Sequence, residues 1–219
     1  MNDSIRIILA DDHEILREGL RGILREHRDI EIVAEAANGT ETVQLTKQFS
    51  PDLVIMDITM PDLNGIEATR QIMRDVPGVR VIALSMHSDR HFIERMLHVG
   101  ASGYLLKHCA SRELMTAIRT VRSGKHYLSQ TITDISLAEI LGKSGEAVPS
   151  LLTLLTAKER EVLQMVAEGL PTKLIAEKMH VTENTIEKHR QHIMDKLRLH
   201  SIAELTKYAI REGITSLDK

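Results

Sequence analysis

Five polar residues of this 219-residue chain directly follow short apolar runs. They are Asp11, Asp12, Asp57, Ser85 and Lys107. Three carboxylates brought together repel one another unless a cation joins them, and oxygen ligands favour Mg²⁺ over zinc or copper. A carboxylate beside such a cation can attack phosphorus and hold an acyl phosphate. Lysine and serine side chains can then donate charge and a hydrogen bond to the phosphoryl oxygens.

The apolar runs predict β-strands that alternate five times with helical patterns. Leu53–Met56 is unbroken, as a strand buried on both faces requires, and Pro61 and Gly65 turn the chain after it. The alternation predicts an α/β fold with a parallel sheet and helices on both faces, so the strand-end residues converge on one edge. The expected strands are Ile5–Ala10, Ile30–Val33, Leu53–Met56, Val79–Leu84 and Gly103–Leu106, and the expected helices are 15–24, Glu41–Gln48, Ile66–Asp75, Arg90–Val99 and Arg112–Val121.

Residues 5–121 resemble a response-regulator receiver domain. The matching residues are Asp11-Asp12, Asp57 before Met60-Pro61-Asp62 and Gly65, Ser85, and Lys107 after Gly103-Tyr104. The resemblance implies a five-stranded, doubly wound, flavodoxin-like receiver over residues 1–122. By position, the resemblance implies that Asp57 is the phosphoacceptor and that Lys107 and Ser85 assist its phosphorylation. Ser85 and Tyr104 would form a switch pair. The implied Mg²⁺ ligands are Asp12, Asp57 and the main-chain carbonyl of Thr59, supported by Asp11. His108 replaces the Pro that often follows the lysine, which argues against a cis peptide there.

Some of these residues have simpler interpretations. Strand-end Asp and Ser often serve only as turn and helix-cap residues. His87 and His91 are four apart, as zinc ligands on a helix can be, but without a third ligand at a suitable spacing exposed histidines are the simpler interpretation. Cys109 is more simply a buried, inert thiol than a reactive one.

Residues 123–150 are predicted to be a linker. Ser123-Gly124 opens the segment, and Gly145–Ser150 has the composition of an exposed connection. Between them one short helix is expected from the apolar residues Ile132, Ile135, Leu137, Ile140 and Leu141.

Residues 151–219 contain four predicted helices. Thr156 caps the first, with Glu159 completing a capping box. Pro171 suits an early position of the second, Thr182 caps a third of about Glu183–Leu197, and a fourth follows. The second and third are close enough in sequence to form a helix-turn-helix. The fourth carries Ile202, Leu205, Ala209 and Ile210.

Charge alone favours a solvated helical face over a nucleic-acid surface. Residues 1–150 carry 17 Lys and Arg against 21 Asp and Glu, a balance of -4, whereas residues 151–219 carry 11 against 10, a balance of +1. This is only a small step toward a nucleic-acid partner.

The residue pattern reverses that interpretation, because this segment resembles the LuxR/NarL (FixJ) DNA-binding domain. The matching residues are Leu155-Thr156, Lys158-Glu159, Glu161-Val162-Leu163, Ala167-Glu168-Gly169-Leu170, Ile175-Ala176-Glu177-Lys178, Thr185-Ile186, His189, Ile193 and Lys196-Leu197. The resemblance implies that the third helix enters the major groove and the fourth forms a dimer face. The implied DNA contacts are Lys188, His189, Arg190, Gln191, Thr182, Asn184, Thr185 and Lys196. Glu187 stands where Lys is frequent, and a carboxylate cannot hold a phosphate but could accept a hydrogen bond from cytosine. Pro171 and Leu174 also depart from the frequent Ser and Glu.

Together the two resemblances imply a two-component response regulator. A sensor histidine kinase would phosphorylate Asp57, and the phosphorylated homodimer would bind double-stranded promoter DNA, with RNA polymerase as a candidate partner. Two rivals are an aspartyl-phosphate phosphatase, which usually has a second Asp where Thr59 stands, and a regulator that works without phosphate, against which the five filled positions argue. No enzyme activity is expected beyond the receiver's own phosphorylation and dephosphorylation.

Composition predicts a cytoplasmic protein without a membrane partner. Hydrophobic residues make up 42% and charged residues 27% of the chain, as in ordinary globular proteins. The single cysteine, Cys109, allows no disulfide within the chain. No apolar run reaches the roughly 18 residues of a membrane span, and no signal-peptide pattern is visible.

Overall fold

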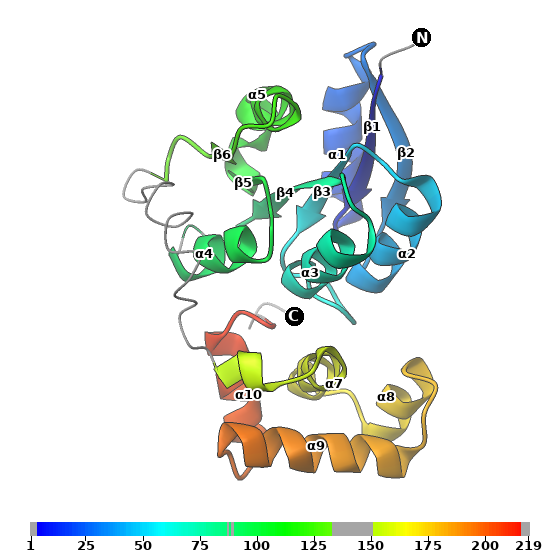
Figure 1. Ribbon diagram of the computed structural model, residues 1–219, viewed down its shortest axis with the longest axis vertical. Helices are drawn as coiled ribbons and strands as arrows, with labels where there is room; N and C mark the ends of the chain where they lie inside the picture. Colours follow the sequence, from blue (N-terminus) through cyan, green and yellow to red (C-terminus); the bar gives the residue numbers. More distant parts are fainter. Residues whose placement is uncertain (1–3, 87, 89, 133–150, 216–219) are drawn as a thin grey trace. The chain divides into compact units, whose positions relative to one another are not determined.

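The computed structural model describes residues 4–86, 88, 90–132 and 151–215. These residues form two compact units, one built on a β-sheet and one made of helices (Figure 1). Within these ranges, no helix is long and apolar enough to cross a membrane. His87 and most of the segment expected to hold a linker helix lie outside the described residues.

The first unit contains a parallel sheet of six strands in the order β2-β1-β3-β4-β5-β6. The prediction of five strands was therefore one short. In β6, Tyr127 pairs with Gly103 and Leu128 with Tyr104. A two-residue strand is too short to show an alternating pattern, so the sequence did not reveal it. The strands are β1 (Ile5–Ala10), β2 (Ile30–Ala36), β3 (Leu53–Asp57), β4 (Arg80–Ser85), β5 (Gly103–Leu106) and β6 (Tyr127–Leu128).

Helices cover both faces of this sheet, as the sequence predicted (Figure 1). Every residue of β3 is buried, and alternate residues such as Ile7 and Ile55 pack in the core under α1 and α5. Their neighbours Ile8 and Val54 point to the other face and are also fully buried. The helices are α1 (Glu14–Arg25), α2 (Gly39–Phe49), α3 (Gly65–Asp75), α4 (Arg90–His98) and α5 (Ala110–Arg122), with a 3₁₀ turn, η1 (Lys107–Cys109), before α5.

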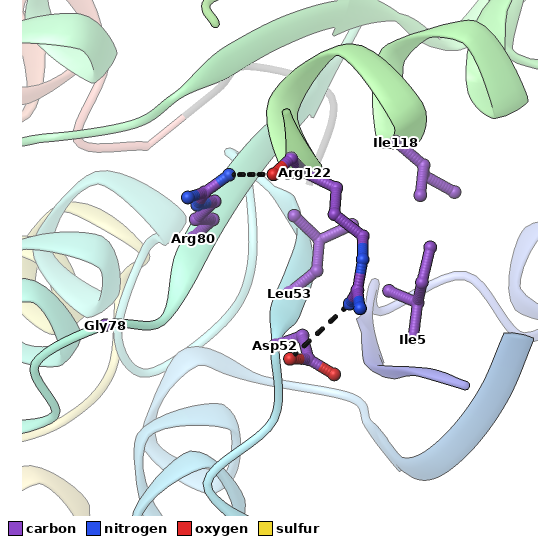
Figure 2. Close-up of a pocket in the computed structure, with 7 residues that line it drawn as sticks. All are labelled: Ile5, Asp52, Leu53, Gly78, Arg80, Ile118 and Arg122. Atoms are coloured by element: carbon purple, nitrogen blue, oxygen red, sulfur yellow. Dashed lines mark hydrogen bonds and ion pairs between the residues drawn. The ribbon is translucent and has the colours of Figure 1, made fainter. Parts of the chain in front are cut away.

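The amino ends of the strands border a cavity of about 300 Å³ (Figure 2). Arg80 donates to the main-chain carbonyls of Val121 and Arg122, the latter at 2.7 Å, and so binds the last turn of α5 to β4. The Arg122 guanidinium lies 3.6 Å from Asp52 Oδ1. The charged groups of this cavity are thus engaged with one another or with the backbone, which gives them a structural role.

A buried carboxylate fastens the chain after α5 to the first unit. Glu113 accepts hydrogen bonds from the Tyr127 hydroxyl at 2.9 Å, the Ser129 hydroxyl at 2.6 Å and the Gln130 main-chain N–H at 3.3 Å. A buried acceptor with several donors is costly to remove, because each donor would be left without a partner. The segment predicted as a linker therefore begins with residues that are bound to the sheet and to α5.

The second unit packs its helices around one apolar core. The core includes Val162, Ile175, Ile186 and Leu205. The helices are α7 (Ala157–Ala167), α8 (Thr172–Lys178), α9 (Glu183–Leu197) and α10 (Ile202–Arg211), preceded by the 3₁₀ helix η2 (Leu151–Leu154).

The helix ends of this unit agree with the sequence in all but one place. Thr156 and Glu159 form the expected capping box, and the Thr182 side chain accepts from the Thr185 N–H. Pro171 lies one residue earlier than expected: it is the N-cap of α8, with extended backbone, and not a residue of its first turn. Without a side-chain oxygen, proline leaves the first N–H groups of α8 uncapped.

Gly65 is required where α3 begins against β3. Its N–H donates to the Ile58 carbonyl at 2.8 Å. A Cβ at this position would lie 1.9 Å from the Asp57 carbonyl oxygen, which is backbone and has no freedom to rotate away. Only glycine therefore allows the loop after β3 to close onto α3.

We expect Gly65→Ala to lower the free energy of unfolding by about 3 kcal/mol, because the methyl group forces backbone to move in a packed region. Gly22→Ala in α1 is the matched control: its Cβ meets no atom within 4 Å. That change should stabilise the helix by about 0.5–1 kcal/mol. Urea denaturation followed by circular dichroism measures both, and equal stability of the two variants would contradict the close approach.

Candidate functional site

The carboxyl edge of the sheet brings together residues that are far apart in the sequence. Lys107 follows β5, and its Nζ atom lies 2.8 Å from Asp57 Oδ2 at the end of β3. The same Nζ lies 2.8 Å from Asp11 Oδ2, directly after β1. The predicted convergence of these three residues is present, and one ammonium group joins two buried carboxylates.

The electrostatics of this cluster leave an excess of negative charge. Burial raises the pKa of Asp57, and the charge of Asp11 raises this pKa further. Lys107 and the Thr59 N–H lower it, and the resulting pKa of Asp57 is about 7, compared with an ordinary value of 3.8. Burial lowers the pKa of Lys107, but Asp57 and Asp11 outweigh it and the net direction is upward. The lysine therefore stays charged, and one cation faces several carboxylates.

The donor set of this cluster fits a hard divalent cation. Ligand atoms of Asp11, Asp12, His13 and Asp57 all lie within 4.8 Å of one another. Most are carboxylate oxygens, the ligands that Mg²⁺ prefers. Burial, and after it the charge of Asp11, raises the pKa of Asp57, and a bound cation would favour the ionised carboxylate.

The two neighbouring aspartates are placed differently. The Asp11 side chain is 1% exposed, whereas that of Asp12 is 20% exposed. The main-chain carbonyl of Asp11 accepts a hydrogen bond from Arg17 Nη1 at 2.6 Å. The side-chain Oδ1 of Asp11 accepts a hydrogen bond from the His13 main-chain N–H at 2.9 Å. Asp11 is thus fixed inside the pocket and Asp12 stands nearer to solvent.

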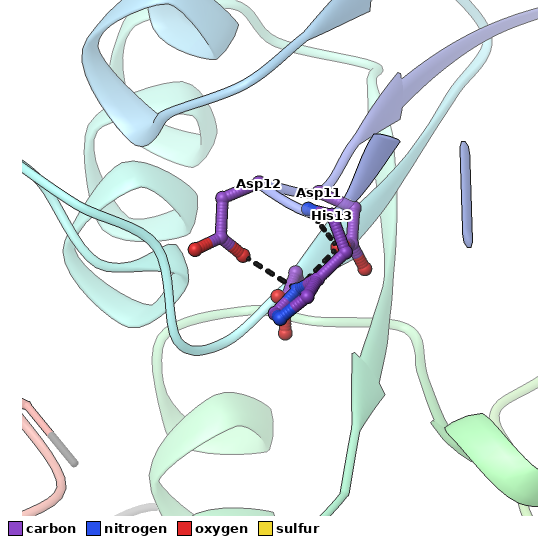
Figure 3. Close-up of side chains that lie close together, drawn as sticks. Asp11, Asp12 and His13 are labelled. Atoms are coloured by element: carbon purple, nitrogen blue, oxygen red, sulfur yellow. Dashed lines mark hydrogen bonds and ion pairs between the residues drawn. The ribbon is translucent and has the colours of Figure 1, made fainter. Parts of the chain in front are cut away.

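His13 and Arg17 were not among the residues predicted for this site. His13 lies beside both aspartates (Figure 3), and its place directly after Asp11-Asp12 was the signal available in the sequence. Arg17 contacts a main-chain carbonyl across the first turn of α1, and no sequence pattern indicates a contact of that kind.

Ser85 and Tyr104 are both buried, Ser85 on β4 beside β3 and Tyr104 on β5, the next strand of the sheet. Ser85 is the last residue of β4, one beyond Leu84, which pairs with Asp57. Tyr104 lies in β5, pairs with Ala83, and accepts a hydrogen bond at its carbonyl from the Ser129 N–H at 2.9 Å. Ser85 therefore reaches the same sheet edge as Asp57. No peptide bond within the described ranges is cis, which agrees with His108 in place of proline.

The residues predicted to contact DNA lie on α9 and at its start. Asn184, Lys188 and Gln191 are exposed, and His189 is half-buried. Gln191 Nε2 donates to Asp195 Oδ1 at 2.9 Å. Thr182 and Thr185 have hydroxyl oxygens 2.9 Å apart at the N-cap of α9, so these hydroxyls already take part in the cap.

Two of the predicted cations are engaged inside the helical unit. Arg190 Nη1 lies 3.0 Å from Thr172 Oγ1 and 3.1 Å from Glu187 Oε1, which links α9 to the start of α8. Lys196 Nζ lies 2.8 and 2.7 Å from the two carboxylate oxygens of Glu159, a residue only 4% exposed. A buried carboxylate needs such a counterion, so Lys196 has a structural role whatever else it contacts.

Comparisons with known proteins match both halves of the chain. The family model described as response regulator receiver domain matches residues 7–119. The model described as bacterial regulatory proteins, luxR family, matches residues 153–209. The oxygen regulatory protein NreC of Staphylococcus carnosus is 36% identical over 214 residues, which cover 96% of this chain and 99% of that protein.

Solved structures agree with these matches. A crystal structure of a LuxR-family two-component response regulator from Aurantimonas sp. SI85-9A1 has a TM-score of 0.57 at 36% identity, covering 65% of this chain and 99% of that one. RcsB, solved as two dimers bound to two parallel DNAs, has a TM-score of 0.57 at 26% identity, covering 94% of this chain and 97% of that one.

We expect Asp57→Asn to stabilise the metal-free protein at neutral pH. The pKa of Asp57 is raised in the folded state, so the wild type loses stability as pH rises from about 4 through about 7, while the neutral amide does not titrate. The variant should match the wild type below about pH 4 and exceed it by about 4 kcal/mol above about pH 8.

Urea denaturation at several pH values with a chelator present measures this difference. Asp29→Asn, which changes an exposed aspartate, is the control and should follow the wild type. A wild type as stable as Asp57→Asn at about pH 8 would show that the pocket does not strain the ionised Asp57 carboxylate.

Proposed function

Because this chain belongs to the LuxR family of two-component response regulators, which join a receiver domain to a LuxR-type DNA-binding domain, we propose that a sensor histidine kinase phosphorylates it at Asp57. The observation that carries this proposal is the Lys107 ammonium, 2.8 Å from both Asp57 and Asp11 in a pocket with excess negative charge. Such a pocket is suited to receive a divalent cation and then a phosphoryl group.

In this mechanism Asp57 is the nucleophile. One of its carboxylate oxygens forms a bond to phosphorus as the bond from phosphorus to the kinase histidine breaks. Asp57 has to be ionised to attack, and its pKa of about 7 in the metal-free pocket means that added positive charge favours the reactive form. When bound, Mg²⁺ would supply that charge and neutralise the phosphoryl oxygens. Asp12, Asp57 and the Thr59 carbonyl would hold the ion, with Asp11 in support.

Lys107 and Ser85 would stabilise the phosphorylated pocket. The lysine already contacts Asp57 Oδ2, so its ammonium is close enough to follow the phosphoryl oxygens when Asp57 is modified. Ser85 at the end of β4 would donate a hydrogen bond to the same group. Tyr104 would respond to the movement of Ser85 and alter the surface around β4 and β5.

We propose that this change leads to a homodimer that binds promoter DNA. RcsB has been solved as DNA-bound dimers, and its similarity covers most of this chain. The proposed domain limits are 1–122 for the receiver, 123–150 for the linker and 151–219 for the DNA-binding domain, with residues 127–130 of the linker segment bound to β5 and Glu113 of the receiver. The protein would act as a regulator and not as an enzyme, in the cytoplasm, with RNA polymerase as a further partner.

The contacts inside the helical unit refine the proposed DNA surface. Lys188 and His189 are the best placed for phosphate contacts, and Asn184 and Gln191 for base edges. Arg190 would act from the position in which Glu187 and Thr172 hold it, and Thr182 and Thr185 from the start of α9. Lys196 would contribute mainly by neutralising Glu159.

Intact-protein mass spectrometry tests the phosphorylation. After incubation with a small-molecule phosphodonor, the wild type should gain one phosphoryl group when Mg²⁺ is present and none when it is chelated. Asp57→Asn should gain none, because an amide cannot form the acyl phosphate. Asp29→Asn is the control and should behave like the wild type. A phosphoryl group that Asp57→Asn still acquires would place the modification elsewhere.

The DNA surface predicts how salt affects binding. Lys188→Ala should weaken binding to a mixed-sequence duplex and reduce the slope of log affinity against log salt by about 1, because one phosphate contact is lost. Lys125→Ala removes the same charge at an exposed position outside the helical unit and should leave the slope unchanged. Fluorescence anisotropy over a salt series gives both slopes, and equal slopes for the two variants would exclude Lys188 as a phosphate contact.

A further inference from the structure

His13 stands at the edge of the acidic pocket, between β1 and α1. Its Nδ1 atom lies 3.0 Å from Asp12 Oδ1 and 3.2 Å from Asp11 Oδ1 (Figure 3). The His13 side chain is 68% exposed, so ions in solution can reach the ring. The imidazole is therefore both beside the carboxylates and accessible.

The backbone of His13 is fixed to the pocket. Its main-chain N–H donates to Asp11 Oδ1 at 2.9 Å, and Asp11 is itself bound to Lys107 at 2.8 Å. His13 is therefore connected to Asp57 through Asp11 and Lys107, because Lys107 contacts both carboxylates.

The spacing of these atoms suits neighbouring ligands of a single ion. Two ligands at about 2.1 Å from an octahedral ion stand about 3 Å apart when they are adjacent. The separation between His13 Nδ1 and Asp12 Oδ1 is 3.0 Å, and ligand atoms of both residues belong to the group within 4.8 Å that includes Asp57. An ion held by Asp12 and Asp57 would therefore have the imidazole within reach of one more coordination position.

We propose that His13 is a ligand of the metal ion in this pocket. Because of it, the pocket prefers divalent ions that readily take nitrogen ligands, such as Mn²⁺ and Co²⁺, over Mg²⁺. The inference rests on the proposed metal site and adds to it one residue and a metal preference. Imidazole is a poor ligand for Mg²⁺ and a good one for first-row transition metals, whereas carboxylates serve both. His13 takes the place of one water on the ion.

A different role for the same geometry is a hydrogen bond from the ring to Asp12. That role would place no nitrogen on the ion, and it would affect Mg²⁺ and Mn²⁺ to the same degree, because it acts only through the carboxylate. The two roles are thus separated by direct detection of nitrogen and by comparison of the two metals.

Pulsed electron paramagnetic resonance of Mn²⁺ bound to the full-length protein at about pH 8 detects the nitrogen. Wild-type protein should show the modulation of a directly bound nitrogen, and protein labelled with ¹⁵N in histidine alone should show the ¹⁵N pattern. His13→Ala and His13→Gln should lose the signal. His108→Ala removes an exposed histidine beside Lys107 and should retain it.

Calorimetric titration with Mn²⁺, Co²⁺ and Mg²⁺ gives the metal preference. His13→Ala should weaken binding of Mn²⁺ and Co²⁺ about tenfold and that of Mg²⁺ by roughly threefold or less. Mn²⁺ bound without a nitrogen signal, a signal that persists in His13→Ala, or equal losses for the three metals would each overturn the proposal while leaving the phosphorylation site intact. If the wild type binds none of these ions, the proposed metal site itself fails.

Discussion

The first unit is organised around the repulsion between buried carboxylates at one edge of its sheet. Buried carboxylates from two strands share a single lysine, and burial raises the pKa of Asp57 to about 7. Such an arrangement is costly to fold without additional positive charge. The same cost makes the pocket responsive, because a metal ion or a phosphoryl group changes the charge that the surrounding strands have to accommodate. In the proposed mechanism, stability and signalling therefore depend on the same electrostatic interaction.

The rest of this unit keeps that edge in register. Parallel strands place their carboxyl ends together, and Gly65 allows the chain after Asp57 to turn tightly into α3. Tyr104 pairs with β6, and Glu113 holds the residues that follow β6. Hydrogen bonds therefore join β5 and α5 to residues 127–130, and in the proposed switch these bonds would carry a movement of β5 out of the receiver.

In the helical unit, a basic residue on α9 does not by its charge alone make a DNA contact. Arg190 and Lys196 have the right type and stand on α9, but each faces a carboxylate of its own unit. Glu159 is buried and requires Lys196, whereas Glu187 is exposed and orients Arg190 toward Thr172. The net charge available to DNA is smaller than a count of basic residues suggests, so recognition depends more on how individual side chains are positioned.

The sequence alone determined the features that depend on local patterns. Apolar runs located the strands, capping residues located Thr156 and Thr182 at helix starts, and residue types at strand ends identified Asp11, Asp57 and Lys107, because neighbouring positions and chain topology are sufficient for each. The tertiary structure alone decided the contacts that join distant residues through side-chain geometry. Packing in three dimensions decides these contacts, and no periodicity along the chain predicts them. They are the pairing of the two-residue strand β6, the hydrogen bonds of Glu113 to β6 and the residues after it, the pairing of Lys196 with Glu159, and the position of His13 beside two aspartates.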